Sequence, residues 1–352
     1  MIEDFLRRQI QATGAMPVGE FMQRCVSGYY AGRDPFGRDG DFTTAPEISQ
    51  MFGEMTGLWS AIAWQIIGAP EEVLLVELGP GRGTLMRDLM RAAAAMPDFR
   101  AAARIHLVET SPVLREMQRE ALAEFDPVWR EDAAHLPDGP AIVIANEFFD
   151  ALPIDQYVFR SDGWHERMVT CRDQFAFTDG PPVSDRRMAE LGAPEARLGE
   201  VFEVNPAARR LVAALAKRFA AQPGALLAID YGHDRAAVGD TLQAVRRHQP
   251  VPALQTPGEV DLTAHVDFAA LVRAASAAKI SPVAGQGSFL RRLGIELRAE
   301  RLAAAHPDQA GDLMAGCHRL INPAGMGTLF KVLAICSPDL PDLPGFERDP
   351  NA

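Results

Sequence analysis

The sequence predicts a doubly wound, Rossmann-like α/β fold with a helical region before it and an antiparallel β insertion within it. Short apolar runs at 73–78, 105–109, 141–145 and 225–230 alternate with helical segments, which is typical of a parallel sheet covered on both faces. Residues 154–180 instead show short alternating runs with turns between them. We expect an N-terminal helical region at 1–70, the core at 71–153 and 200–337, and the β-rich insertion at 154–199.

The N-terminal region is expected to be mainly helical. Residues 1 to about 32 have an amphipathic pattern that places Phe21, Met22 and Val26 on one helix face. A loop dense in turn-forming residues follows at 34–41. Thr44 and Glu47 have the spacing of a capping box, which predicts a helix that runs to about Ile67.

The core elements follow in order along the chain. They are the strand 73–78, the helix 84–95, the strand 105–109, a helix opened by Ser111-Pro112, the strand 141–145, the helix 206–221 and the strand 225–230. Residues 234–262 show no regular pattern, and Asp261-Leu-Thr263 is expected to begin a helix to about Ala277. Two further strands are expected at 279–283 and 328–335, and Gln286-Gly-Ser-Phe289 resembles a flexible loop.

The bulk properties exclude several classes of protein. Of 352 residues, 47% are hydrophobic and 23% charged, as in ordinary globular proteins. The net charge of −12 argues against a nucleic acid partner. No stretch approaches the roughly 18 apolar residues of a membrane span, and the N-terminus lacks an apolar signal core, so we expect a cytoplasmic protein and no membrane partner. Arg- and Ala-rich, Lys-poor usage indicates a bacterial source.

Metal and disulfide chemistry are not expected. The four cysteines, Cys25, Cys171, Cys317 and Cys336, lie far apart in the sequence and form no C-x-x-C pair. A zinc cage or a disulfide framework needs closely spaced or paired cysteines. We therefore assign no metal ligand.

The segment Glu77-Leu-Gly-Pro-Gly-Arg-Gly83 predicts a cofactor site after the first core strand. Its glycines permit a sharp turn and a close approach of ligand to backbone. A dinucleotide loop has the spacing G-x-G-x-x-G, and an acid such as Glu77 would repel a pyrophosphate. S-adenosylmethionine carries an ammonium and a sulfonium instead, so Glu77 favours it. Glu109 is placed for the ribose hydroxyls and Asp132 for the adenine amino group. The expected cofactor residues are Glu77, Gly79, Pro80, Gly81, Gly83, Glu109, Asp132 and Asn146.

Several long segments resemble the MidA family, whose mitochondrial members are complex I assembly factors. They are 41–49, 77–84, Asn146-Glu-Phe-Phe-Asp-Ala-Leu-Pro153, Ile229-Asp-Tyr-Gly232, Asp261-Leu-Thr-Ala-His-Val-Asp-Phe268, 286–290 and 326–331, which together span nearly the whole chain. The resemblance implies a class I methyltransferase fold. In the mitochondrial relatives it also implies symmetric dimethylation of an arginine on a complex I subunit. The expected partner is thus a protein that carries the target arginine, and a homodimer is left open.

The acceptor side is expected beyond the strand 141–145. Methyltransferases that act on neutral amides or adenine usually carry Asn/Asp-Pro-Pro-aromatic there, whereas this chain has Asn146-Glu-Phe-Phe-Asp150. Carboxylates suit a guanidinium, because it offers a rigid fork of donors. The expected catalytic residues are Glu147, Asp150 and His233, with Glu147 or His233 as proton acceptor. The expected substrate residues are Phe148 and Phe149, which can sandwich the guanidinium, and Asp41 and Glu47.

Some of these residues also have purely structural interpretations. Asp150 and Glu47 are good capping residues, the two phenylalanines are good core residues, and His265 is more often a packed histidine than a base. Two other functions stay open besides protein arginine methylation. One is methylation of a small amine or amide nitrogen, and the other is an assembly factor that binds S-adenosylmethionine without turnover.

Overall fold

The computed structural model describes residues 2–31, 41 and 43–347, which form two compact units. The sheet unit comprises Thr43–Phe148, Leu211–Gly232 and Ala275–Ala352. The insertion unit comprises Met1–Phe42, Phe149–Arg210 and His233–Ala274. This division differs from the ranges expected from the sequence, because the N-terminal helices group with the β insertion.

The sheet of the sheet unit is doubly wound. Its strands follow the order β15 (Lys279–Ile280), β17 (Phe330–Cys336), β10 (Gly224–His233), β5 (Ala141–Asn146), β2 (Val73–Leu78), β3 (Ala103–Val108) and β4 (Val128–Arg130). The strands from β10 to β4 are parallel, whereas β17 runs antiparallel to β10, to β15 and to the short β16 (Ala284–Gly285). The chain winds from β2 through β3 to β4, then returns to β5 on the other side of β2. The topological switch point therefore lies between β2 and β5, where open α/β sheets bind ligands.

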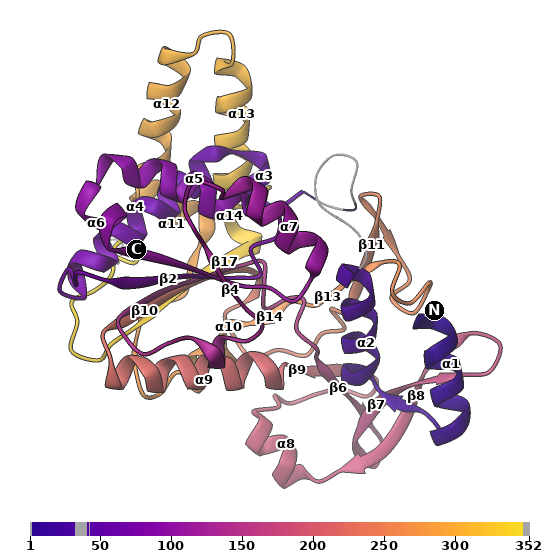
Figure 1. Cartoon of the computed structure of the whole chain (residues 1–352). Helices are drawn as coiled ribbons and strands as arrows, with labels where there is room; N and C mark the ends of the chain where they lie inside the picture. Colours follow the sequence, from indigo (N-terminus) through magenta and orange to yellow (C-terminus); the bar gives the residue numbers. More distant parts are fainter. Residues whose placement is uncertain (1, 32–40, 42, 348–352) are drawn as a thin grey trace. The chain divides into compact units, whose positions relative to one another are not determined.

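Helices cover both faces of this sheet, with α4 and α5 over one face and α9 over the other (Figure 1). The helices that contribute to the unit are α3 (Ala45–Ile48), α4 (Gln50–Ile66), α5 (Thr84–Ala92), α6 (Pro97–Ala102), α7 (Pro112–Ala121), α9 (Pro206–Ala221), α11 (Gln286–Arg292), α12 (Ile295–Ala305), α13 (Ala310–Ile321) and α14 (Met326–Leu329), with 3-10 turns η1 (Ala93–Ala95) and η2 (Ala133–His135). Alternate residues of the strands, such as Leu75, Leu107 and Ile144, join the buried core under α4 and α5. The α12–α13 pair projects from the sheet in Figure 1.

The insertion unit is built on antiparallel strands. One sheet contains β1 (Met16–Pro17), β7 (Gly163–Cys171), β6 (Asp155–Arg160), β9 (Val201–Val204) and β8 (Phe175–Val183), and a second contains β12 (Gln249–Val251), β11 (Gln243–Arg246) and β13 (Asp261–Thr263). The remaining elements are α1 (Ile2–Thr13), α2 (Val18–Ala31), α8 (Asp185–Leu191), β14 (Val266–Asp267) and α10 (Phe268–Ala274). Leu6, Phe21 and Met22 of the two N-terminal helices pack with Val169 in one buried cluster. The antiparallel pairing of β6 with β7 and with β9 confirms the β insertion of the predicted fold class.

Two expected helices begin or end elsewhere. Thr44 is the N-cap of α3, but its side chain makes no capping hydrogen bond, and the helix breaks at Ser49, whose hydroxyl accepts the amide of Met51 and starts α4. The predicted capping box of Thr44 and Glu47 is therefore wrong. Asp261–Thr263 forms strand β13 against β11, and the helix begins only at Phe268, where Asp267 accepts the amide of Ala270.

Other differences concern less regular segments. The expected irregular stretch 234–262 contains β11 and β12, and the expected flexible loop at 286–289 is the buried start of helix α11. Most of the loop expected at 34–41 lies outside the described residues. In the described part of the chain, no helix is long and apolar enough to cross a membrane.

Candidate functional site

The glycine loop, residues 79–83 between β2 and α5, is a tight turn, which we call the cofactor cradle. Gly79, Gly81 and Gly83 have φ angles of 61°, 54° and 81°, the left-handed region that favours glycine. The amide of Gly83 donates to the carbonyl of Pro80 at 2.8 Å and closes the turn. A Cβ added to Gly79 would lie 3.0 Å from the Phe148 ring. The loop thus requires glycine, and it leads into the N-terminus of α5.

Glu77 lies near the end of β2 with only 3% of its surface exposed. Burial raises the pKa of its carboxyl to about 8, although a hydrogen bond from the backbone of Met86 favours the charged form. Its Oε2 has no hydrogen-bond partner among the residues that the structure describes. A buried acceptor without a donor is costly. The site therefore fits a ligand that brings a donor or a positive charge, as S-adenosylmethionine does.

Glu109 follows β3 and is also buried. Its Oε1 accepts the amides of Thr110 and Ser111, each at 2.7 Å, just before α7. Burial raises the pKa of Glu109, and these amide hydrogen bonds partly offset the rise. One carboxylate oxygen is thus committed to the backbone. Asp132 is exposed and accepts the amide of Ala134 at 2.8 Å, so its side chain caps the turn η2.

Asn146 is the last residue of β5, and Glu147 follows it directly. Ala145 pairs with Leu78 in the parallel sheet, so the loops that start at Gly79 and at Glu147 leave adjacent strand ends. Asn146 is buried, and its Oδ1 has no partner within the described residues. Glu147 has a φ of 49°, which is uncommon for a residue with a side chain. Backbone strain of this kind concentrates at functional sites.

Helix α3 contacts both of these loops. The amide of Ala45 donates to Oε1 of Glu147 at 3.0 Å. Oε1 of Glu47 accepts the hydroxyl of Thr84 at 2.6 Å, and its Oε2 lies 3.8 Å from the Arg82 guanidinium. Glu47 therefore braces the glycine loop and does not cap its own helix.

The other predicted site residues belong to the insertion unit. Asp41 is buried and accepts the Tyr29 hydroxyl at 2.7 Å and the amide of Arg247 at 2.8 Å. Phe149 is fully buried, which is typical of a packing residue rather than of a ring open to a substrate. Asp150 is 6% exposed, and its carbonyl accepts the amide of Ala264.

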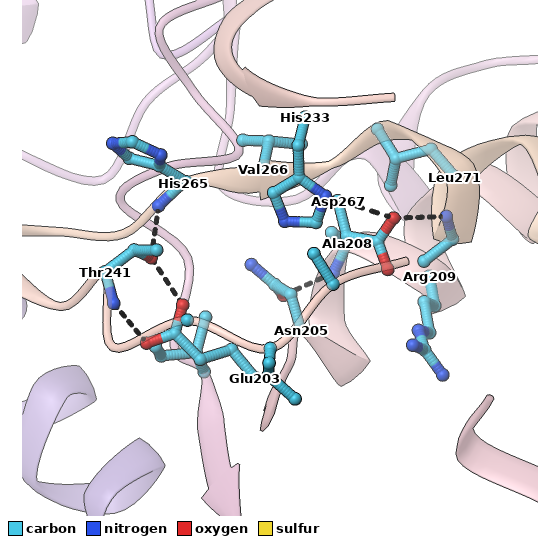
Figure 2. A pocket seen from close by; sticks show the side chains of 15 residues that line it. Glu203, Asn205, Ala208, Arg209, His233, Thr241, His265, Val266, Asp267 and Leu271 are labelled. Carbon is cyan, nitrogen blue, oxygen red and sulfur yellow. Dashed lines mark hydrogen bonds and ion pairs between the residues drawn. The ribbon is translucent and has the colours of Figure 1, made fainter. Parts of the chain in front are cut away.

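His233 lines a pocket of the insertion unit (Figure 2). Its Nδ1 lies 2.6 Å from the carbonyl oxygen of Arg235 and 4.0 Å from Oδ1 of Asp267. Because a carbonyl oxygen can only accept, Nδ1 is the donor in the contact with Arg235. His265 lies between β13 and β14 and not in a helix, and its amide donates to Thr241 in the same pocket.

Two buried polar residues near the strand ends were not among the predicted site residues. Asp230 of β10 is 0% exposed, and its Oδ2 accepts the amide of Phe148 at 3.2 Å. Gln118 of α7 is also 0% exposed and lies at four-residue spacing between buried Leu114 and Leu122. A polar residue on the apolar stripe of a helix was the signal that could have identified Gln118. No group of three or more His, Cys, Asp or Glu in the described ranges could hold a metal ion.

The chain is similar in sequence to a family of known proteins. A family model described as an S-adenosyl-L-methionine-dependent methyltransferase matches residues 55–285. The protein arginine methyltransferase NDUFAF7, mitochondrial, of Mus musculus is 36% identical over 94% of this chain and 83% of its own length. Its Homo sapiens counterpart is 34% identical over 94% and 82%.

Solved structures extend the likeness to the whole fold. A Burkholderia thailandensis protein with bound S-adenosyl-homocysteine superposes with a TM-score of 0.84 at 28% identity, over 99% of this chain and 92% of that one. A native structure from the same organism gives 0.85 at 29% identity, over 99% and 94%. The predicted fold class and cofactor are thereby confirmed. The chain belongs to this family of S-adenosyl-L-methionine-dependent methyltransferases.

Proposed function

We propose that this methyltransferase modifies an arginine side chain of a protein partner, with a respiratory complex I subunit as the first substrate to test. The proposal is supported by relatives named protein arginine methyltransferase that align over most of their length. Composition supports a bacterial source, for which we propose a cytoplasmic location, whereas the relatives are named mitochondrial.

The donor side of the proposed site is the switch point between β2 and β5. The residues proposed to hold the cofactor are Glu77, Gly79, Pro80, Gly81, Gly83, Glu109, Asp132 and Asn146. When bound, S-adenosylmethionine supplies a methyl group on a sulfonium. Glu77 provides a buried acceptor for a cationic group, the glycines allow the left-handed turn that brings the backbone toward the ligand, and Oε2 of Glu109 is available to a hydroxyl.

The acceptor side rests on one observation, the carboxylate of Glu147 held in a left-handed backbone directly after β5. A carboxylate at this position can bind a guanidinium through charge-assisted hydrogen bonds and orient one nitrogen. It can also accept the proton that this nitrogen must lose. Phe148 would then face the guanidinium plane, and Asp150 and His233 of the insertion unit stay proposed as further catalytic groups.

Replacement of Glu147 by glutamine tests this proposal. Glu147→Gln keeps the size of the side chain but removes its charge and replaces one acceptor with a donor. We expect S-adenosylhomocysteine affinity to change little and methyl transfer to an arginine peptide to fall at least about a hundredfold, the typical contribution of a positioned base. Transfer is measured with labelled cofactor and by mass spectrometry.

The exposed Glu71 of the same unit offers a matched control, since Glu71→Gln also removes one carboxylate and should transfer normally. Unchanged transfer by Glu147→Gln would return Glu147 to a structural role. If Glu147→Gln blocked transfer but restored assembly of the respiratory complex in cells, the methylation would be separable from an assembly function.

A further inference from the structure

Gln118 is a primary amide buried in an otherwise apolar stripe of α7. Its neighbours on the stripe, Leu114 and Leu122, are 2% and 0% exposed. A buried amide is costly unless its donors and acceptor are all bonded. Its partners therefore indicate what the residue does.

The orientation of the Gln118 amide is fixed by Trp129 of the strand β4. The indole Nε1 donates to Oε1 of Gln118 at 2.8 Å. Because an indole nitrogen can only donate, Oε1 must face the tryptophan and the amino group must face the opposite side. A flipped amide would set two donors against each other.

The amino group of Gln118 links the glycine loop after β2 to Glu109, the residue that follows β3. Its Nε2 lies 2.7 Å from the carbonyl oxygen of Gly81 and 3.4 Å from Oε2 of Glu109. An amino group has two hydrogens, so it can serve both acceptors. Oε1 of Glu109 already accepts the two amides before α7. The contact from Gln118 therefore orients the other carboxylate oxygen, Oε2.

We propose that Gln118 is a positioning residue that orients Oε2 of Glu109 toward the ribose hydroxyls of the cofactor while it holds the carbonyl of Gly81 in the glycine loop. This inference rests on the proposed assignment of Glu109 to the ribose, and it does not depend on which group receives the methyl. The same donation favours the ionised form of Glu109, whose pKa burial raises.

The test compares two ligands, S-adenosylhomocysteine and its analogue without the ribose hydroxyls. Gln118→Met removes the bridge and keeps the volume and apolar packing. We expect it to weaken S-adenosylhomocysteine binding on the order of tenfold, the loss typical of one hydrogen bond near a charged group, and to weaken binding of the analogue by a clearly smaller factor, because only the lost contact to the Gly81 carbonyl affects the analogue. At saturating cofactor the kcat should stay near that of the parent while KM rises.

Two controls make the result decisive. Gln65→Met makes the same change at an exposed position of α4 and should alter neither affinity. In the double variant with Glu109→Gln, Gln118→Met should add only the smaller loss that the analogue shows, because the rest of its effect acts through Glu109. If Gln118→Met does not fold, Gln118→Leu replaces it, since leucine is also apolar and also lacks both donors.

Each contrary outcome has a definite meaning. Equal weakening of both ligands, or additive losses in the double variant, would make Gln118 a structural residue only and overturn the proposal. The proposal would also be overturned if Gln118→Met bound S-adenosylhomocysteine with unchanged affinity while Glu109→Gln bound it more weakly. That result would leave the assignment of Glu109 to the ribose intact. Unchanged affinity in Glu109→Gln would overturn that assignment itself.

Discussion

Replacement of Glu77 by glutamine should remove a large pH dependence from the stability of the ligand-free protein. Burial raises the pKa of Glu77 from 4.5 to about 8. The folded protein therefore binds this proton more tightly than the unfolded chain does. Below pH 4.5 both states are protonated and the group has no effect. As the pH rises from there through about 8, Glu77 lowers the free energy of unfolding.

The size of the effect follows from the pKa difference. At about 1.4 kcal/mol for each pH unit, it is at most about 5 kcal/mol and is fully developed above pH 8. Relaxation of the site makes this an upper bound. Glu77→Gln is neutral at every pH, so its stability should match that of the parent in weak acid and exceed it increasingly as the pH rises.

Urea unfolding of both proteins between pH 5 and pH 9 measures this difference, with any common dependence on other acids cancelling in the comparison. A ligand cation beside Glu77 should favour ionisation. S-adenosylhomocysteine binding near neutral pH should then release most of one proton from the parent and none from Glu77→Gln, as calorimetry in buffers of different ionisation enthalpy would detect. Parallel stability curves for the two proteins, or equal proton release, would refute the reasoning.

Three further predictions concern the cradle and its support. Gly81→Val places a β-branched residue at a φ of 54°, so it should abolish S-adenosylhomocysteine binding in calorimetry while circular dichroism shows the fold retained. Tight binding by this variant would show that the glycine loop is not part of the cofactor site. Glu109→Ala should weaken binding by about 1–3 kcal/mol, and an unchanged Kd would remove Glu109 from the site. Arg298→Met should lower the free energy of unfolding by about 1–3 kcal/mol, because Arg298 donates to the buried Glu54 carboxylate at 2.7 and 3.0 Å. The cofactor affinity of this variant should not change, and an unchanged unfolding midpoint would show that the Arg298–Glu54 pair does not stabilise the fold.

The parts of the fold that were predicted correctly are those specified by neighbouring residues. The strand 73–78, the glycine turn and the start of α5 form one continuous segment, so local pattern alone predicts them. The same holds for Ser111-Pro112, where the cap and the first helical residue are adjacent.

The missed features depend on residues far apart in the chain. Glu147 meets the amide of Ala45 about a hundred residues earlier, and no local signal links the two. The strand at Asp261 forms because β11 offers a partner, which overrides its helix-like start. The position of Gln118 on an apolar helix stripe marks it as unusual, but its role depends on Trp129 and Gly81, which are not its neighbours in the sequence.

The single turn of helix α3 has a consequence for the dynamics of the protein. Its Ala45 amide bonds Glu147 in the loop after β5. Its Glu47 carboxylate pairs with Arg82 in the loop after β2 and accepts the hydroxyl of Thr84, the next residue but one. Four residues thus tie together two loops that leave neighbouring strands, and the break at Ser49 separates them from the long helix α4. A local opening of α3 would release both loops in one event, without unfolding of the sheet. Amide hydrogens of the two loops should consequently exchange with solvent at coupled rates, and ligand that orders one loop should slow exchange in the other.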